Sequence, residues 1–441
     1  MARYDVRMSV SKGVSTTNFT PTWVERMGLR RWYAISGDSP GLELQATAPG
    51  TRYLIDTDPA RDSELNPART IKERLRRMAG REPKSPWHGV AGFSAITEGW
   101  NSAVYASRYG PSGSMIVYGG GHNDYFGSDV HAFDLASREW RRIADGYVSG
   151  RDDEYGLGAR YPDSVYPDGS PLPPHTYDYV QYDPLGNDYI LLKGQTELGP
   201  NVKAVAIPHL FNLDTLTWRH GPQHPTAILN SGGWSTWDAS RRVFWGHSGD
   251  DGGGNAFIGL SPDNDNRNGT FGRWTDRFPN KLPGIANHNA MQIDPVRDLI
   301  VVSVHARDAL YAIDPADPGR EIERLESAGP KPALRPYAAM EYARNLARVV
   351  YFSPLDHGTV YFIAPAQDRD SPFAGAKKWA WYACRPAPDT LDPVADAASR
   401  SRYPVNISQT FGRFRIASFG AIDLAILVRH VDSSVYAMRL T

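Results

Sequence analysis

One recurring pattern of turns and short apolar runs constrains the fold more than any other feature of the sequence. In each copy an apolar or aromatic residue stands before Asp, Pro or a small residue, and a hydrophobic run of strand length follows. The six turns begin at Tyr109, Tyr182, Trp237, Ile293, Tyr342 and Phe419. Their spacing of roughly 50 to 75 residues is typical of repeated sheet units, and one such sheet cannot bury both of its faces alone. The sequence therefore predicts an all-β fold in which repeated sheets pack against one another.

The clearest copy lies between Ser114 and Trp140. Its first apolar run breaks on a glycine triplet, residues 119 to 121, which His122 follows directly. Glycine permits positive φ and close approach of backbone or ligand, so we expect His122 at an exposed strand end and not inside a strand. The order of a glycine pair, a short strand ending in Asp134 and then a tryptophan resembles a kelch repeat.

This resemblance implies a β-propeller of four-stranded kelch-like blades, with six repeats visible in the sequence. The last repeat stops after its third strand, whereas residues 29–36 have the pattern of a fourth strand without a blade of its own. We expect this N-terminal strand to close the ring, which would remove both free sheet edges. Residues 1–28 are then an N-terminal extension and residues 29–441 a single propeller domain. A helical insertion is predicted at 67–79, and a degenerate seventh blade within 37–91 stays open.

Composition agrees with this fold class and excludes several partners. The counts of 41 Gly and 34 Pro favour turns, and the formal net charge of -1 gives no general attraction to nucleic acid or to an acidic membrane. The single cysteine, Cys384, excludes an internal disulfide framework. We expect a soluble chain, because the N-terminus has no signal-peptide pattern and no apolar run approaches the ~20 residues of a membrane span. The compartment stays open among the cytoplasm, a virion, and export after signal removal.

The propeller geometry predicts where the chemistry lies. The starts of the innermost strands and the ends of the second strands meet on one face around the central channel. The second-strand ends carry His122, Gln195, His247, His305 and His430. The innermost-strand starts carry Trp100, Asn101, His175, Tyr177, Trp234, His288, Asn289, Arg335 and Arg413. One histidine at a strand end is often an ordinary turn residue, but their common position in the repeats favours a ligand site. Imidazole, guanidinium and aromatic groups together suit a polar, anionic ligand with sugar-like faces.

At the segment GGGHNDY, residues 119 to 125, the sequence resembles the bacterial kelch-like propellers of the galactose-oxidase-like superfamily, and within it the polysaccharide lyases of the ulvan lyase type. The resemblance implies a lyase that cleaves uronate-containing glycans by β-elimination. His122 and His175 would then be the base and the acid, Tyr177 the tyrosine, and Arg335 the clamp that neutralises the uronate carboxylate.

The other predicted residues of this face would bind substrate. They are Trp100, Asn101, Gln195, Trp234, His247, His288, Asn289, His305, Arg413 and His430. In the lyase pattern an arginine follows the tyrosine at the end of the next strand, whereas Lys193 and Gln195 stand there in this chain. The clamp would therefore come from another blade.

No metal site or cofactor is predicted. The chain has no HExxH or CxxC spacing, and Cys384 lacks the tyrosine and histidine set of a copper-radical site. A structural or catalytic divalent metal on the histidine-rich face stays an alternative.

Two classes of function fit the sequence. The first is an enzyme, a polysaccharide lyase, or a binding domain whose partner is a polysaccharide or another glycan. The second is a non-enzymatic propeller that serves as a virion-associated or tail-associated structural component, or as a receptor-binding component, with assembly partners of its own. The missing signal sequence favours the second class, and the common position of the histidines favours the first.

Overall fold

The structure is a computed structural model. It describes residues 19–36, 100–119, 128–144, 164–192, 206–224, 229, 232–249, 256–262, 273–274, 278–279, 282, 287–365, 379–400, 410, 412–429 and 434–441. The helix predicted at 67–79, the segment 37–91, and the candidate residues His122, Gln195 and His430 lie outside the described residues.

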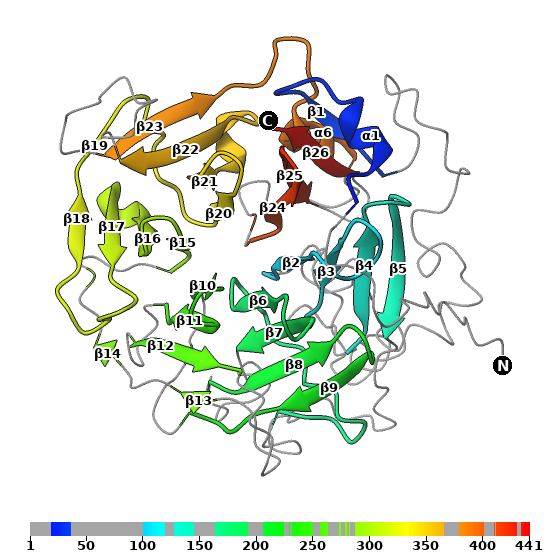
Figure 1. The fold of residues 1–441 in the computed structure, drawn as a ribbon, viewed down its shortest axis with the longest axis vertical. Helices are drawn as coiled ribbons and strands as arrows, with labels where there is room; N and C mark the ends of the chain where they lie inside the picture. Colours follow the sequence, from blue (N-terminus) through cyan, green and yellow to red (C-terminus); the bar gives the residue numbers. More distant parts are fainter. Residues whose placement is uncertain are drawn as a thin grey trace, which may run out of the picture.

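The described strands form six antiparallel blades around a central axis, which confirms the predicted all-β propeller (Figure 1). Blade 1 contains β2 (Ala103–Ala106), β3 (Ser114–Val117), β4 (Val130–Asp134) and β5 (Glu139–Ala144). Blade 2 contains β6 (Val180–Asp183), β7 (Asp188–Leu192), β8 (Pro208–Asn212) and β9 (Thr217–His220). Blade 3 contains β10 (Trp234–Asp238), β11 (Val243–His247), β12 (Ala256–Ser261), β13 (Arg273–Trp274) and the short β14 (Phe278–Pro279).

The other three blades follow the same order from the axis outward, except that the outer strand of blade 6 comes from the N-terminus. Blade 4 contains β15 (Ala290–Asp294), β16 (Leu299–Val304), β17 (Ala309–Ile313) and β18 (Glu323–Leu325). Blade 5 contains β20 (Ala339–Ala343), β21 (Arg348–Phe352), β22 (Val360–Pro365) and β23 (Trp379–Cys384), and β19 (Ser327–Ala328) pairs with β23 in parallel. Blade 6 contains β24 (Phe414–Phe419), β25 (Ile422–Val428), β26 (Val435–Arg439) and β1 (Trp32–Ala34). Short helices are α1 (Thr22–Glu25), α6 (Pro393–Arg400), η2 (His305–Arg307) and η3 (Pro354–Asp356). No helix in these ranges is long and apolar enough to cross a membrane.

The recurring turn found in the sequence is the hairpin between the first and second strands of a blade. In three blades its aspartate, which is Asp183, Asp238 or Asp294, accepts hydrogen bonds from backbone N–H groups inside the turn. The turns end on left-handed residues with φ near 54°: Asn187, Arg242 and Asp298. A side chain that satisfies turn N–H groups explains why aspartate recurs at this position.

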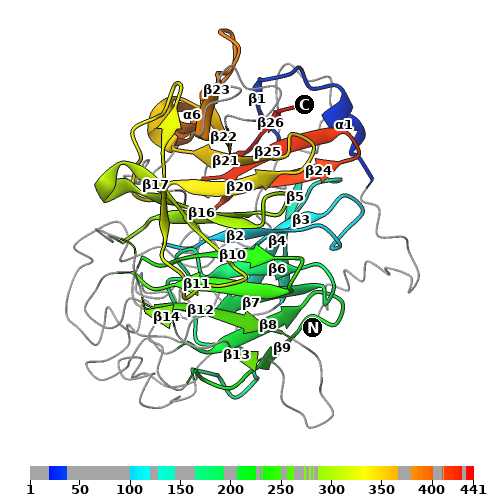
Figure 2. The ribbon, with the colours of Figure 1, turned by 60° about the vertical axis from the view of Figure 1, so that its left-hand side comes forward.

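The N-terminal strand closes the ring, as predicted. Strand β1 pairs antiparallel with β26, so that Trp32 lies opposite Met438. The buried Trp32 indole N–H donates to the Gly358 carbonyl at 2.8 Å, beside blade 5, and the Trp23 indole N–H donates to the Leu135 carbonyl of blade 1 at 2.8 Å. Figure 2 shows β1 beside β26, with α1 next to them. The segment thus holds the last blade to both of its neighbours.

Replacing Trp32 by alanine is predicted to lower the free energy of unfolding by about 3–5 kcal/mol. The substitution leaves a cavity among apolar residues of blades 5 and 6 and removes the hydrogen bond to Gly358. Urea unfolding followed by tryptophan fluorescence measures the change. Phe19→Ala, at a side chain that is 64% exposed, is the matched control and is expected to change the free energy by at most about 0.5 kcal/mol. Equal effects of the two substitutions would contradict the closure role of Trp32.

Candidate functional site

The innermost strands surround the axis (Figure 1). The segments that lead into them lie at one end of this ring of strands, which we call the channel mouth. In five blades the residue two or three positions before the innermost strand is left-handed. These residues and their φ angles are Tyr177 (44°), Gly232 (70°), His288 (66°), Tyr337 (63°) and Gly412 (75°). The left-handed region is costly for residues with bulky side chains. Tyr177, His288 and Tyr337 nevertheless adopt it, at positions where two other blades carry glycine.

Hydrogen bonds between neighbouring blades hold these turns in place. The backbone N–H of Tyr177 donates to Trp100 O at 2.7 Å, that of His288 to Gly232 O at 2.6 Å, and that of Tyr337 to His288 O at 3.0 Å. The remaining neighbours are joined by Asp178 N to Gly233 O, Thr410 N to Tyr337 O, and Arg413 Nη1 to Asn101 O. These six contacts form a closed circuit around the mouth, from blade 1 through blade 6 and back to blade 1.

Five rings line up along this circuit and form what we call the mouth arc: Trp100, His175, Tyr177, His288 and Tyr337. The centroid distances between consecutive rings are 4.7, 5.7, 5.6 and 4.2 Å. Residues from four blades therefore make one continuous row of aromatic and imidazole ring contacts, only part of which is accessible. The structure brings together four predicted site residues here, and Tyr337 joins them.

The arc differs in exposure along its length. His175 is fully buried and Tyr177 is 5% exposed, whereas Trp100, His288 and Tyr337 are half-buried. Burial, and secondarily the nearby His305, lowers the pKa of His288 to about 3, so its imidazole is neutral near pH 7. Burial raises the pKa of Tyr337, which keeps its hydroxyl protonated. The accessible part of the arc is therefore uncharged.

Several other predicted residues contribute to the structure of the mouth. Asn101 is buried and accepts a hydrogen bond from Thr176 N at 2.9 Å, and Asn289 accepts one from His305 N at 3.2 Å. The first glycine of the triplet, Gly119, has φ 122°, and a Cβ there would overlap Asn101 Oδ1. The positive φ and the close packing against the Asn101 and Thr176 side chains thus explain this glycine.

The remaining predicted residues divide into a buried and an exposed group. The rings of Trp234 and His247 stack at 4.5 Å, and both are buried. The buried Arg413 guanidinium donates to Asn101 O at 2.5 Å and Val428 O at 3.2 Å. Arg335, in contrast, is exposed.

Sequence reasoning missed a charged cluster inside the channel, which we call the Arg415 hub: Arg415, Asp178, Glu341 and Ser102. The Arg415 guanidinium forms an ion pair with Glu341 of blade 5 and contacts Asp178 of blade 2 at 3.1 Å. It also donates to Ala103 O at 2.6 Å and Ser102 Oγ at 3.1 Å, both beside blade 1. One side chain of blade 6 thus connects three other blades.

The electrostatics of the hub reflect its burial. Burial raises the pKa of Asp178 to about 6, although the positive charge of Arg415 lowers it. Burial likewise raises the pKa of Glu341. Gly412 permits this arrangement, because a Cβ there would overlap Asp178 Oδ1. Glu341 shares one face of its inner strand with Ala339 and Ala343, and a charge between two small residues on that face is the sequence signal for a group that faces the channel.

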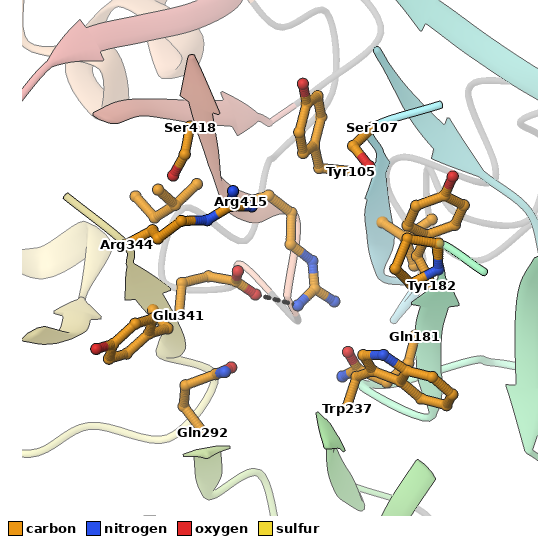
Figure 3. A pocket seen from close by; sticks show the side chains of 14 residues that line it. Tyr105, Ser107, Gln181, Tyr182, Trp237, Gln292, Glu341, Arg344, Arg415 and Ser418 are labelled. Carbon is orange, nitrogen blue, oxygen red and sulfur yellow. Dashed lines mark hydrogen bonds and ion pairs between the residues drawn. The ribbon is translucent and has the colours of Figure 1, made fainter. Parts of the chain in front are cut away.

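A cavity of about 250 Å³ lies beyond the hub (Figure 3). The innermost strand or hairpin of every blade contributes to its wall, and the wall includes residues at the far ends of these strands, such as Arg344 and Ser418. The cavity is thus centred toward the opposite end of the channel from the mouth arc. In the described ranges, no three His, Cys, Asp or Glu side chains converge so as to hold a metal ion.

Comparisons with known proteins show similarity in shape only. No family model and no curated protein sequence matches the chain. A solved protein of unknown function from Bacteroides thetaiotaomicron is 7% identical with a TM-score of 0.41, covering 74% of this chain and 66% of that one. This chain thus spans just under two thirds of that protein. A chain of a nidogen/laminin complex is 11% identical with a TM-score of 0.36, covering 64% of this chain and 84% of that one. Similarities of this size carry no information about activity.

Asp178→Asn is predicted to remove a component of stability that depends on pH. The folded-state pKa of about 6 lies above the ordinary value of 3.8, so the folded protein binds more protons than the unfolded chain between these pH values. The stability that Asp178 contributes is therefore full below pH 3.8 and is lost as the pH rises through 6. The free energy of unfolding of the wild type minus that of the variant should fall over this window by about 2–3 kcal/mol.

Urea unfolding at a series of pH values measures this difference. Asp298→Asn is the control, because hydrogen bonding to Arg241 lowers the pKa of Asp298 and gives a dependence of opposite sign. A wild-type-minus-Asp178→Asn difference that stays constant or rises between pH 4 and 6 would contradict the buried, raised carboxyl.

Proposed function

We propose that the channel mouth binds a uronate-containing polysaccharide and that the protein cleaves it by β-elimination. The observation that carries this proposal is the mouth arc, in which half-buried rings of Trp100, His288 and Tyr337 are presented from three blades. Aromatic faces with polar edges suit a sugar, whose ring has an apolar face and a rim of hydroxyl groups. The arc rests on hydrogen-bonded strand starts, which makes it a preformed surface.

Charge on this side of the molecule supports an acidic sugar. Arg335 lies two residues before Tyr337, and its guanidinium is exposed and suited to pair with a carboxylate through two hydrogen bonds. Its positive charge favours the ionised form of the Asp308 and Asp356 carboxyl groups. A uronate would compete with these two carboxylates for Arg335, so we expect moderate affinity per sugar and a contribution from several sugars along the chain.

The elimination step needs a base for the proton next to the uronate carboxylate, neutralisation of that carboxylate, and an acid for the leaving oxygen. Arg335 supplies the neutralising charge. The hydroxyl of Tyr337 is protonated near neutral pH and can donate to the leaving oxygen, although burial raises its pKa further and makes it a weaker acid. In this step His122, the base expected from the sequence, would take the proton, and Tyr337 in place of the buried His175 would return one to the leaving oxygen. The roles of His122, His175 and Tyr177 remain predictions from sequence.

Binding without cleavage is the second candidate function. The burial of His175 and the low pKa of His288 favour it, because neither imidazole is then an effective exposed base near neutral pH. A receptor-binding component, as expected for a virion-associated propeller, would use the same mouth arc.

Arg335→Ala is predicted to weaken binding of an alginate, pectate or ulvan chain about 10- to 100-fold, because a charge-assisted pair with the uronate is lost. Affinity electrophoresis across the panel of polysaccharides measures retention. Leu185→Ala is the control and should leave retention unchanged, because Leu185 is exposed on the β6–β7 hairpin, at the opposite end of the inner strands. Retention that is the same in both variants would contradict a site at the mouth.

Two substitutions of Tyr337 separate binding from cleavage. Tyr337→Phe keeps the ring and removes the hydroxyl, so binding should persist while the ultraviolet absorbance of the unsaturated uronate product no longer rises. Tyr337→Ala should lose both. An absorbance that rises at the wild-type rate in Tyr337→Phe would exclude this hydroxyl as the acid, and no rise in the wild type with any substrate would leave binding as the function.

A further inference from the structure

We propose that the channel cavity beyond the Arg415 hub is a second binding site, which holds one neutral sugar or a polyol of similar size. This site goes beyond the proposed function, because it lies in another part of the channel from the mouth arc and requires no charge on its ligand. Its volume of about 250 Å³ falls just below the ~300–1,000 Å³ of pockets that hold drug-sized ligands. A single sugar ring is the size of molecule that such a space admits.

The charges around the cavity balance. Two guanidinium groups, of Arg415 and Arg344, and the Glu341 carboxylate lie in its wall, and Asp178 completes the hub behind Arg415. Arg415 is engaged by both carboxylates and by Ala103 O, so its charge is already neutralised within the protein. An ionic ligand would find no large excess of opposite charge here. The wall therefore selects a neutral, hydrogen-bonding ligand.

Hydrogen bonds within the wall fix which polar atoms remain for a ligand. The side-chain N–H₂ of Gln181 donates to Ser235 Oγ at 3.0 Å, and that of Gln292 donates to Ile293 O at 3.2 Å. Each amide oxygen is then the acceptor that is left. Figure 3 shows Gln181 and Trp237 on one side of the cavity and Glu341 on the other.

Trp237 supplies an independent observation that points to a ligand. Its indole N–H is buried and has no hydrogen-bond acceptor among the described residues. A buried donor without a partner is destabilising, so such groups are normally satisfied by protein, water or ligand. A sugar hydroxyl both donates and accepts, so a polyol can donate to the amide oxygens of Gln181 and Gln292. It can also accept from the Trp237 indole once a shift of this side chain opens the buried N–H to the cavity. The aromatic body of Trp237 adds an apolar face for the sugar ring.

Ligand-observed saturation-transfer NMR on the full chain tests the site with free glucose, galactose and mannose, and with glucuronate as the charged counterpart. We expect saturation transfer to at least one neutral sugar. In Arg335→Ala, which removes the proposed uronate clamp at the mouth, this transfer should exceed the transfer to glucuronate. Trp237→Phe keeps an aromatic ring but removes the N–H together with the five-membered ring of the indole, and it should weaken binding about 2- to 10-fold. Gln292→Leu is a second variant with an expected loss of similar size.

Two controls separate the cavity from other sites. Trp218→Phe, in the outer strand β9, removes another buried indole N–H that has no acceptor among the described residues, and it should leave sugar binding unchanged. Tyr337→Ala should also leave it unchanged, because Tyr337 belongs to the mouth arc. No transfer to any neutral sugar, a preference for glucuronate that persists in Arg335→Ala, or a signal lost in Tyr337→Ala but kept in Trp237→Phe would overturn the proposal. Failure of this site would leave the proposed polysaccharide site at the mouth unaffected.

Discussion

The antiparallel pairing of β1 with β26 is the interaction on which the rest of the structure depends. Without it blade 6 would have three strands, and β26 would expose an unpaired edge. Since Trp32 and Trp23 also reach the neighbouring blades, the same segment fixes the position of blade 6 in the ring. A channel with two defined ends exists only because the ring is closed. Both candidate sites are therefore products of a contact between the two ends of the described chain.

Closure of the ring holds several residues of the channel mouth in a strained backbone conformation. Tyr177, His288 and Tyr337 occupy left-handed positions that cost of the order of 1–3 kcal/mol each, and hydrogen bonds between neighbouring blades offset that cost. Their rings are thereby held at defined positions around the axis. The Arg415 hub acts in the same way deeper in the channel, because one guanidinium joins blade 6 to blades 1, 2 and 5. Strain and buried charge both occur where the blades meet, which is where we propose that ligands bind.

Much of this architecture could be predicted from the sequence. The turn aspartates such as Asp183 and Asp238 act through local hydrogen bonds, so their recurrence marks each blade without any knowledge of the fold. The repeat pattern then places the strand starts on one face, which is why Trp100, His175, Tyr177 and His288 were correctly expected near one another.

Two properties of the site could not be predicted in this way. Whether a polar residue at a strand start faces the channel or the next blade depends on side-chain packing between blades, so the sequence did not indicate that His175 and Asn101 are buried. The Arg415 hub joins residues 178, 341 and 415, which approach one another only in the closed ring. Alternation along a strand indicates on which face of the sheet a residue lies. It does not indicate which residue of another blade will be its partner.

A crystal structure of the protein soaked with a uronate oligosaccharide tests the central claim most directly. The account predicts sugar rings stacked along Trp100, His288 and Tyr337, with a carboxylate within hydrogen-bonding distance of the Arg335 guanidinium. An oligosaccharide bound at the outer strands of a blade, with the mouth arc unoccupied, would contradict it.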